Sequence, residues 1–160
     1  MSKQVADIRT QVLVLGAGPG GYTAAFRAAD LGKRVVLVER YASLGGVCLT
    51  VGCIPSKALL HTADVIQEVA ELEHMGVRYT RPKIDLDKMR AGKDKVVGKL
   101  TGCLGALAKQ RKVQVVTGVA KFAYPKHMEV QTSDGLTRIE FEHCIIACGS
   151  SPVKITGFPN

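Results

Sequence analysis

The stretch QVLVLGAGPGG, from Gln11 to Gly21, decides the fold of this chain. Its first half is a short apolar run that stops at Gly16, which is typical of a buried parallel strand. The small and apolar residues from Pro19 to Leu31 predict a helix packed on a sheet, with Gly32 as its C-terminal glycine. The order of strand, glycine-rich turn and helix therefore predicts the first unit of an α/β fold.

The glycines of this turn, Gly16, Gly18 and Gly21, have the spacing GxGxxG of a dinucleotide-binding site. Gly16 allows the tight turn, Gly18 lets the backbone approach a pyrophosphate, and Gly21 lets the helix press on the strand. Free N–H groups at the helix N-terminus favour the phosphates. Glu39 ends a second buried strand, 34–39, where a carboxylate can hydrogen-bond ribose hydroxyls. The motif indicates a dinucleotide but leaves FAD and NAD open, and the alternative is that the glycines serve only a turn.

The rest of the chain extends this unit. The predicted elements are a helix from Pro55 to about Leu72, a longer helix over 85–111 weakened by four glycines, β-segments at 113–122, 127–132 and 137–142, and a short buried strand at 143–150 that ends at Gly149. Turn residues at 133–135 separate the segments 127–132 and 137–142, which predicts an antiparallel meander. The predicted fold class is α/β, a Rossmann-like doubly wound parallel sheet with an inserted antiparallel β-meander.

Composition and charge narrow the class of protein. A chain of 160 residues that is 46% hydrophobic has the size of one domain with one main core. The apolar run from Val12 to Leu15 is too short for a signal sequence or a membrane span, so we expect a cytoplasmic protein without membrane contact. From Arg78 to Lys112 there are eleven Lys or Arg against three Asp. Because only 5% of the residues are aromatic, a solvated helix face is favoured over a nucleic-acid interface.

The stretch GGVCLTVGCIPSK, residues 45–57, carries two cysteines five positions apart. A continuous helix or strand would hold Cys48 and Cys53 beyond the reach of a disulfide, so a bend is needed, and Gly52 supplies it. The helix that begins nearby places Cys53 at its N-terminus with Cys48 folded back on it. The helix N-terminus and Lys57 both lower a thiol pKa. The pattern predicts an activated dithiol pair.

Two other interpretations of the pair stay open on spacing alone. The stretch lacks the further cysteines or histidines of known zinc patterns, so no metal is expected. Free cysteines are often buried, and an inert pair is the second alternative. Inert burial is the default for Cys103, Cys144 and Cys148, because each lies in a predicted core element with no adjacent cationic group. The odd number of cysteines, five, argues against the disulfide framework of a secreted protein.

With the GxGxxG turn and Glu39, the cysteine stretch resembles the flavin disulfide reductases, and within them the branch that oxidises dihydrolipoamide. The resemblance implies FAD as the cofactor and NAD⁺ as the electron acceptor. It also implies three catalytic residues. Cys48 would exchange with a dithiol substrate, Cys53 would lie against the flavin, and Lys57 would approach the flavin ring.

The resemblance further implies the cofactor contacts. They gather on the glycine turn, the end of the second strand, the cysteine stretch and two later segments: Gly16, Gly18, Pro19, Gly21, Glu39, Arg40, Gly46, Val47, Cys48, Cys53, Lys57, Gly118, Ala120, Ala147, Cys148, Gly149 and Ser150. The family usually has Asn where this chain has Thr50, and Thr where it has Cys148, so local side-chain hydrogen bonds are expected to differ.

Members of that family are longer than this chain, which implies an organisation in parts. Residues 1–150 resemble the N-terminal part of an FAD-binding domain, and residues 151–160 resemble a connector towards an NAD-binding domain. The implied partners are dihydrolipoamide on the lipoyl domains of 2-oxo acid dehydrogenase complexes and, in the intact enzyme, a second copy in a homodimer. The alternatives are another flavin disulfide reductase, a non-catalytic dinucleotide-binding module and, as the weakest, a nucleic-acid binder.

Overall fold

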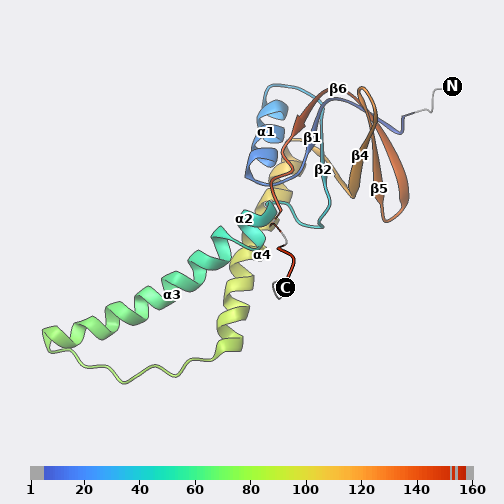
Figure 1. Cartoon of the computed structure of the whole chain (residues 1–160). Coiled ribbons are helices and arrows are strands. Elements are labelled where there is room, and N and C mark those ends of the chain that lie inside the picture. The colour runs from blue at the N-terminus through green and yellow to red at the C-terminus, as the bar shows by residue number, and fades with distance from the viewer. Residues whose placement is uncertain (1–5, 152, 154, 158–160) are drawn as a thin grey trace.

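A computed structural model describes residues 6–151, 153 and 155–157 of the chain. Its strands form one sheet in the order β3-β2-β1-β6-β5-β4 (Figure 1). The strands are β1 (Ile8–Leu15), β2 (Val35–Glu39), β3 (Gln114–Thr117), β4 (Val119–Tyr124), β5 (His127–Thr132) and β6 (Gly135–Ile146). β1 lies between β2 and β6 and is parallel to both, and β3 is parallel to β2 at one edge. β5 and β4 extend the sheet in antiparallel fashion beyond β6.

Helix α1 (Pro19–Asp30) and the second half of α4 (Leu86–Gln110) cover one face of the parallel strands. The other helical segments are α2 (Gly46–Thr50), α3 (Cys53–Glu71) and the 3₁₀ helix η1 (Leu72–Met75). Val14 and Leu37 of the sheet are fully buried, and they share a core with Phe26 of α1 and with Leu104 and Ala108 of α4. α1 follows β1 and leads back to β2, which confirms the predicted strand, helix and strand unit.

The antiparallel meander β4-β5-β6 packs against the other side of the parallel strands. Side chains alternate between the two faces of a strand, so Leu13 and Val36 point away from the helices. They share a second core with Met128, Val130 and Ile139, and all five are almost fully buried. The predicted fold class, α/β and Rossmann-like with an added meander, is confirmed.

Two details of the predicted strands are wrong. The segment 113–122 is not one strand of the meander but two strands, since β3 pairs in parallel with β2 and β4 pairs with β5. The break falls at Gly118, where a Cβ would collide with the carbonyl of Gln131 and would lie 2.8 Å from Cγ1 of Val130. The segments 137–142 and 143–150 are not separate strands either. β6 runs unbroken from Gly135 to Ile146 because its first half pairs with β5 and its second half with β1.

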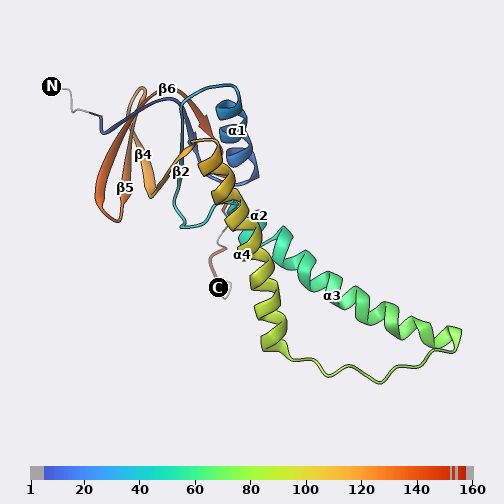
Figure 2. The ribbon, with the colours of Figure 1, turned by 180° about the vertical axis from the view of Figure 1, so that it is seen from behind.

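Helix α3 and the first half of α4 extend away from the sheet as an arm, in which the two helices diverge and the segment after η1 connects their outer ends (Figures 1 and 2). The predicted helix over 85–111 is present as α4, and the Asp85 carboxylate caps it by accepting a hydrogen bond from the Lys88 N–H at 3.0 Å. Many apolar side chains of the arm are exposed, for example Leu60 at 59% and Met75 at 81%. In the described part of the chain, no helix has both the length and the apolar character needed to cross a membrane.

Candidate functional site

A cavity of about 560 Å³ lies at the carboxyl ends of the parallel strands. This edge of an α/β sheet is where ligands bind in doubly wound folds, because the connecting loops diverge there. Its walls come from the glycine turn, the end of β2, the start of α2, the corner between β3 and β4, and the segment after β6. The lining residues are Leu15, Gly16, Gly18, Pro19, Val38, Glu39, Arg40, Tyr41, Gly46, Val47, Cys48, Gly118, Val119, Ala120, Ala147, Cys148, Gly149, Ser150 and Ser151.

The glycine turn forms one wall of the cavity, and its glycines differ in what they contribute. Gly16 has a φ of +96°, and its N–H donates to the carbonyl of Val38 at 2.8 Å. A Cβ on Gly18 would meet nothing within 4 Å, so the backbone there is open to the cavity at the N-terminus of α1. Gly21 has a different position. A Cβ on Gly21 would collide with the carbonyl of Gly16, so Gly21 packs behind the turn and does not line the cavity.

Glu39 is hydrogen-bonded to three segments around the cavity. Its carboxylate is buried, with only 6% of the residue exposed. Oε2 accepts a hydrogen bond from the N–H of Ala17 at 2.7 Å, and Oε1 accepts one from the N–H of Tyr41 at 3.1 Å. Its main-chain carbonyl accepts from the N–H of Gly118 at 2.8 Å. The side chain predicted to contact a ribose is thus already bonded to the protein backbone.

Sequence reasoning missed part of the cavity wall. The missed residues are Leu15, Val38, Tyr41, Val119 and Ser151. Each adjoins a predicted contact at or near a strand end, so the rule that ligands bind at the carboxyl ends of parallel strands could have found them. Tyr41 also stacks with Arg40, whose guanidinium carbon lies 5.0 Å from the centre of the tyrosine ring.

The two cysteines of the 45–57 stretch lie on successive helices. Cys48 is in α2 and half-buried, whereas Cys53 begins α3 and is exposed. The chain bends between them, and the N–H groups of Val51 and Gly52 both donate to the carbonyl of Val47, at 2.9 and 2.7 Å. Both cysteines are free thiols. The predicted bend is confirmed, and it brings the two thiols close enough for Cys53 to act on the pKa of Cys48.

The predicted activation of the pair is wrong for Cys48. Its pKa lies above the ordinary thiol value, first because its thiol is hydrogen-bonded to Cys53, then because of desolvation and the negative charge that Cys53 can carry. The charge of Lys57 and the N–H of Cys53 lower the pKa of Cys48, but they do not outweigh these causes. In the free dithiol, Cys48 therefore stays protonated to higher pH than an isolated cysteine.

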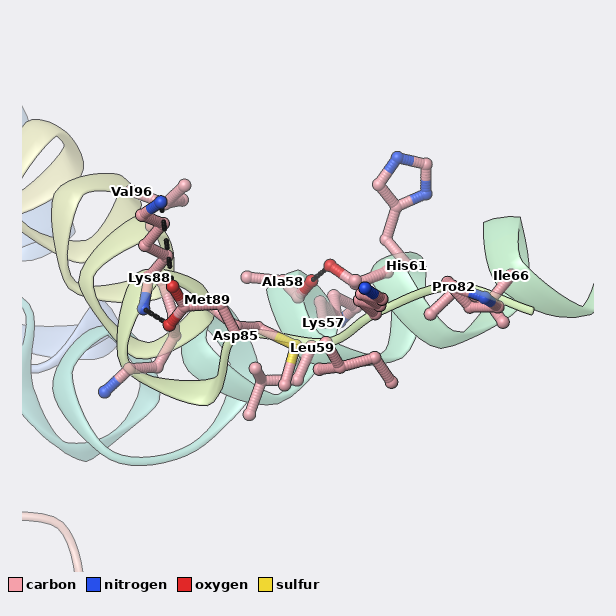
Figure 3. A pocket seen from close by; sticks show the side chains of 15 residues that line it. Lys57, Ala58, Leu59, His61, Ile66, Pro82, Asp85, Lys88, Met89 and Val96 are labelled. Atoms are coloured by element: carbon pink, nitrogen blue, oxygen red, sulfur yellow. Dashed lines mark hydrogen bonds and ion pairs between the residues drawn. The ribbon is translucent and has the colours of Figure 1, made fainter. Parts of the chain in front are cut away.

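Lys57 and Cys53 do not line this cavity. Lys57 lines a second cavity of about 800 Å³ between α3 and α4, on the other side of which lies Lys88 (Figure 3). Lys83 and Lys93 line the same cavity. Much of its wall is apolar, and Figure 3 shows Ile66 on α3 and Met89 and Val96 on α4. Ile84, from the segment before α4, also lines it. Lys57 thus follows the dithiol by one helical turn and marks the start of a separate groove.

The other cysteines differ from the expectation of inert burial. Cys103 and Cys148 are exposed, because the surface of α4 and the end of β6 are not covered there. The Cys148 thiol donates a weak hydrogen bond to the carbonyl of Leu15, with a separation of 3.8 Å. Cys144 is half-buried, and its pKa is raised by burial and, to a lesser extent, by the charge that Cys148 can carry. Within the described residues, no group of three or more His, Cys, Asp or Glu side chains is placed to hold a metal ion.

Comparison with known proteins agrees with this geometry. The family model of pyridine nucleotide-disulphide oxidoreductases matches residues 10–160. The chain is 53% identical over 154 residues to a dihydrolipoyl dehydrogenase of Vibrio cholerae and 54% identical over 155 residues to one of Haemophilus influenzae. Each match covers 96% of this chain and 32% of the relative, so the chain spans about a third of the length of these relatives.

A solved structure shows the same fold. It is a Cu(II) complex of the flavoprotein disulfide reductase RclA from Escherichia coli, which matches with a TM-score of 0.77 at 27% identity. The match covers 92% of this chain and 30% of the other. With a family model matched over nearly all its length, this chain belongs to the pyridine nucleotide-disulphide oxidoreductases.

Proposed function

We propose that the chain is the FAD-binding and redox-active part of a dihydrolipoyl dehydrogenase. One observation carries the proposal: the cavity formed by the GxGxxG turn is lined on another side by Cys48, and Cys53 has the largest influence on the pKa of the Cys48 thiol. A dinucleotide site and a dithiol therefore share one space. The identity of about half to dihydrolipoyl dehydrogenases over 96% of the chain supports this particular member of the family.

The residues of the cavity fit an FAD. The open backbone at Gly18 and the N-terminus of α1 would receive the pyrophosphate, since N–H groups there lack helical partners. Glu39, Arg40, Gly118 and Ala120 would surround the adenosine. The remaining contacts would come from lining residues of the cavity: Gly16, Pro19, Gly46, Val47, Cys48, Ala147, Cys148, Gly149 and Ser150. Cys53 and Lys57 would approach the flavin from outside this lining, and Gly21 would support the turn from behind.

In the oxidised protein, Cys48 and Cys53 would form a disulfide. A thiolate of dihydrolipoamide attacks the Cys48 sulfur, a mixed disulfide forms, and Cys53 leaves as a thiolate. The second substrate thiol then attacks the mixed disulfide and releases Cys48, so the substrate leaves oxidised and the protein pair is reduced. Bound FAD would supply the acceptor for this electron pair, and NAD⁺ would be the final acceptor in the intact enzyme. Lys57 would stabilise the thiolate that is generated.

The same proposal covers the organisation and setting of the protein. Residues 1–150 would form the N-terminal part of an FAD-binding domain, and 151–160 a connector towards an NAD-binding domain. The partners would be dihydrolipoamide on the lipoyl domains of 2-oxo acid dehydrogenase complexes and a second copy in a homodimer of the intact enzyme. The location would be the cytoplasm. These assignments are supported by the likeness to bacterial dihydrolipoyl dehydrogenases.

The visible spectrum of the purified chain, mixed with FAD and freed of unbound cofactor, tests the proposal. We expect a flavin spectrum that gains a long-wavelength thiolate-to-flavin band when dithiol is added. Cys53→Ser should abolish that band and keep the flavin, whereas Cys103→Ser is the matched control and should behave as the unchanged chain. Absence of retained flavin would contradict the cofactor assignment. Retained flavin without the band would point to a non-catalytic dinucleotide-binding module.

A further inference from the structure

We infer that Glu39 is a positioning residue: its carboxylate sets the phosphate-facing turn and the start of α2 before a nucleotide binds. The inference deepens the proposed function, because it rests on the cavity being a nucleotide site. A carboxylate at the end of the second strand is expected to contact the ribose of the ligand. In this structure both of its oxygens also accept hydrogen bonds from backbone N–H groups.

Both carboxylate oxygens of Glu39 are engaged by backbone N–H groups. Oε2 accepts from Ala17 at 2.7 Å and Oε1 from Tyr41 at 3.1 Å, in a place where Glu39 is only 6% exposed. Hydrogen bonds from neutral donors to an ionised acceptor are stronger than those between neutral groups, and burial strengthens them further. The carboxylate therefore ties the glycine turn, on one side, to the loop that follows β2, on the other.

Ala17 transmits the position of Glu39 to the cysteine-bearing helix. Ala17 is fully buried, its N–H is held by Glu39, and its carbonyl accepts a hydrogen bond from the N–H of Gly45 at 2.8 Å. The next residue, Gly46, begins α2, and a Cβ on it would lie 2.7 Å from Cα of Gly18. The glycine turn and the helix that carries Cys48 are thus packed together around one residue, Ala17.

Two backbone N–H groups donate to this side chain, so it must offer two acceptors and no donor. A carboxylate meets that requirement. Glutamine would present an NH₂ group to one of the two N–H donors, so one hydrogen bond would be lost and two donors would face each other. The main-chain carbonyl of Glu39 also accepts from Gly118, so the residue joins the corner between β3 and β4 to the same unit. Substitution of the side chain leaves that main-chain bond in place.

Two nucleotides, one with and one without the ribose hydroxyls, distinguish a positioning role of Glu39 from recognition of the ribose. We expect Glu39→Gln to weaken the binding of 2′,3′-dideoxy-ADP by about tenfold and that of ADP by at least as much, measured by calorimetric titration. The reason is that a displaced turn affects the diphosphate, which both probes carry. If Glu39 only recognised the ribose, the dideoxy compound would lose no affinity. That result, or unchanged affinity for both probes, would overturn the inference.

A control and a second measurement complete the test. Glu68→Gln changes an exposed carboxylate of α3 and should leave both affinities unchanged. Hydrogen exchange of the unsubstituted, nucleotide-free chain should show protection of the Ala17 and Tyr41 amides, even if the Gln variant does not fold. Rapid exchange at both amides would refute the positioning role. If the unsubstituted chain binds neither FAD nor ADP, the proposed function fails, and the exchange measurement still decides whether the carboxylate holds the turn.

Discussion

At the scale of single residues, a substitution at Gly18 distinguishes an effect on cofactor binding from an effect on the stability of the fold. Gly18 has φ −69° and ψ −179°, a conformation that alanine also adopts, and a Cβ there would touch no other atom. The methyl group would instead occupy the space that the proposed phosphates need.

We therefore expect Gly18→Ala to weaken FAD binding by at least about tenfold, while the stability of the cofactor-free chain changes by less than about 0.5 kcal/mol. Flavin fluorescence titration and thermal unfolding measure the two effects. Gly20→Ala is the control, because Gly20 also has open space around it but does not line the cavity. Equal FAD affinity in both variants would show that the phosphates bind elsewhere.

The thiol of Cys48 gives a second prediction at this scale. Because hydrogen bonding to Cys53, desolvation and the charge of Cys53 raise its pKa, alkylation of Cys48 should accelerate only as the pH rises above the ordinary thiol pKa. Cys53→Ala removes the first and third of these causes, so the alkylation profile should move to lower pH. Lys57→Met removes a stabilising positive charge, so the profile should move to higher pH.

Mass spectrometry of the Cys48 peptide after timed alkylation over a pH series measures these shifts. Lys99→Met serves as a matched control, since Lys99 is exposed on α4 and does not act on Cys48. A profile that does not move in Cys53→Ala would show that the neighbouring thiol is not what raises the pKa of Cys48.

At the scale of elements, the turn between β4 and β5 stores backbone strain. Lys126 has a φ of +65°, in the left-handed region that favours glycine, and its carbonyl accepts from the N–H of Phe141 at 3.0 Å. We expect Lys126→Gly to stabilise the chain by about 0.5 to 1 kcal/mol, because the relief of strain exceeds the added entropy of the unfolded state. Denaturant unfolding measures the change. Lys121→Gly, within β4, should destabilise by a similar amount, and stabilisation by both would contradict the argument.

At the scale of the whole molecule, the described residues bring Cys48 and Cys53 close together beside a cavity. Among the described residues, the groups that act on Cys48 are Cys53 and Lys57, and no histidine is one of them. General-base catalysis contributes about 10²- to 10⁴-fold. We therefore expect dihydrolipoamide oxidation by NAD⁺ to be at least about a hundredfold slower with this chain than with the Vibrio cholerae dihydrolipoyl dehydrogenase assayed beside it. Comparable rates would show that this chain supplies the base itself.

The sequence by itself determined the features that depend on neighbouring residues. The GxGxxG turn between β1 and α1, the bend between Cys48 and Cys53, and the extent of α4 all follow from local backbone chemistry, and the structure has them where the sequence predicts them. The family resemblance rests on the same local stretches.

Only the tertiary structure decided the features that depend on residues far apart in the chain. The break at Gly118 and the unbroken β6 arise from pairing with strands far away in sequence, which local patterns do not encode. The direction of the Glu39 carboxylate depends on the N–H of Ala17, which donates to it. The exposure of Cys103 depends on which side of α4 packs against the rest of the protein. A pKa, a hydrogen-bond partner and a buried fraction are properties of the packed surroundings, and those surroundings exist only once the chain has folded.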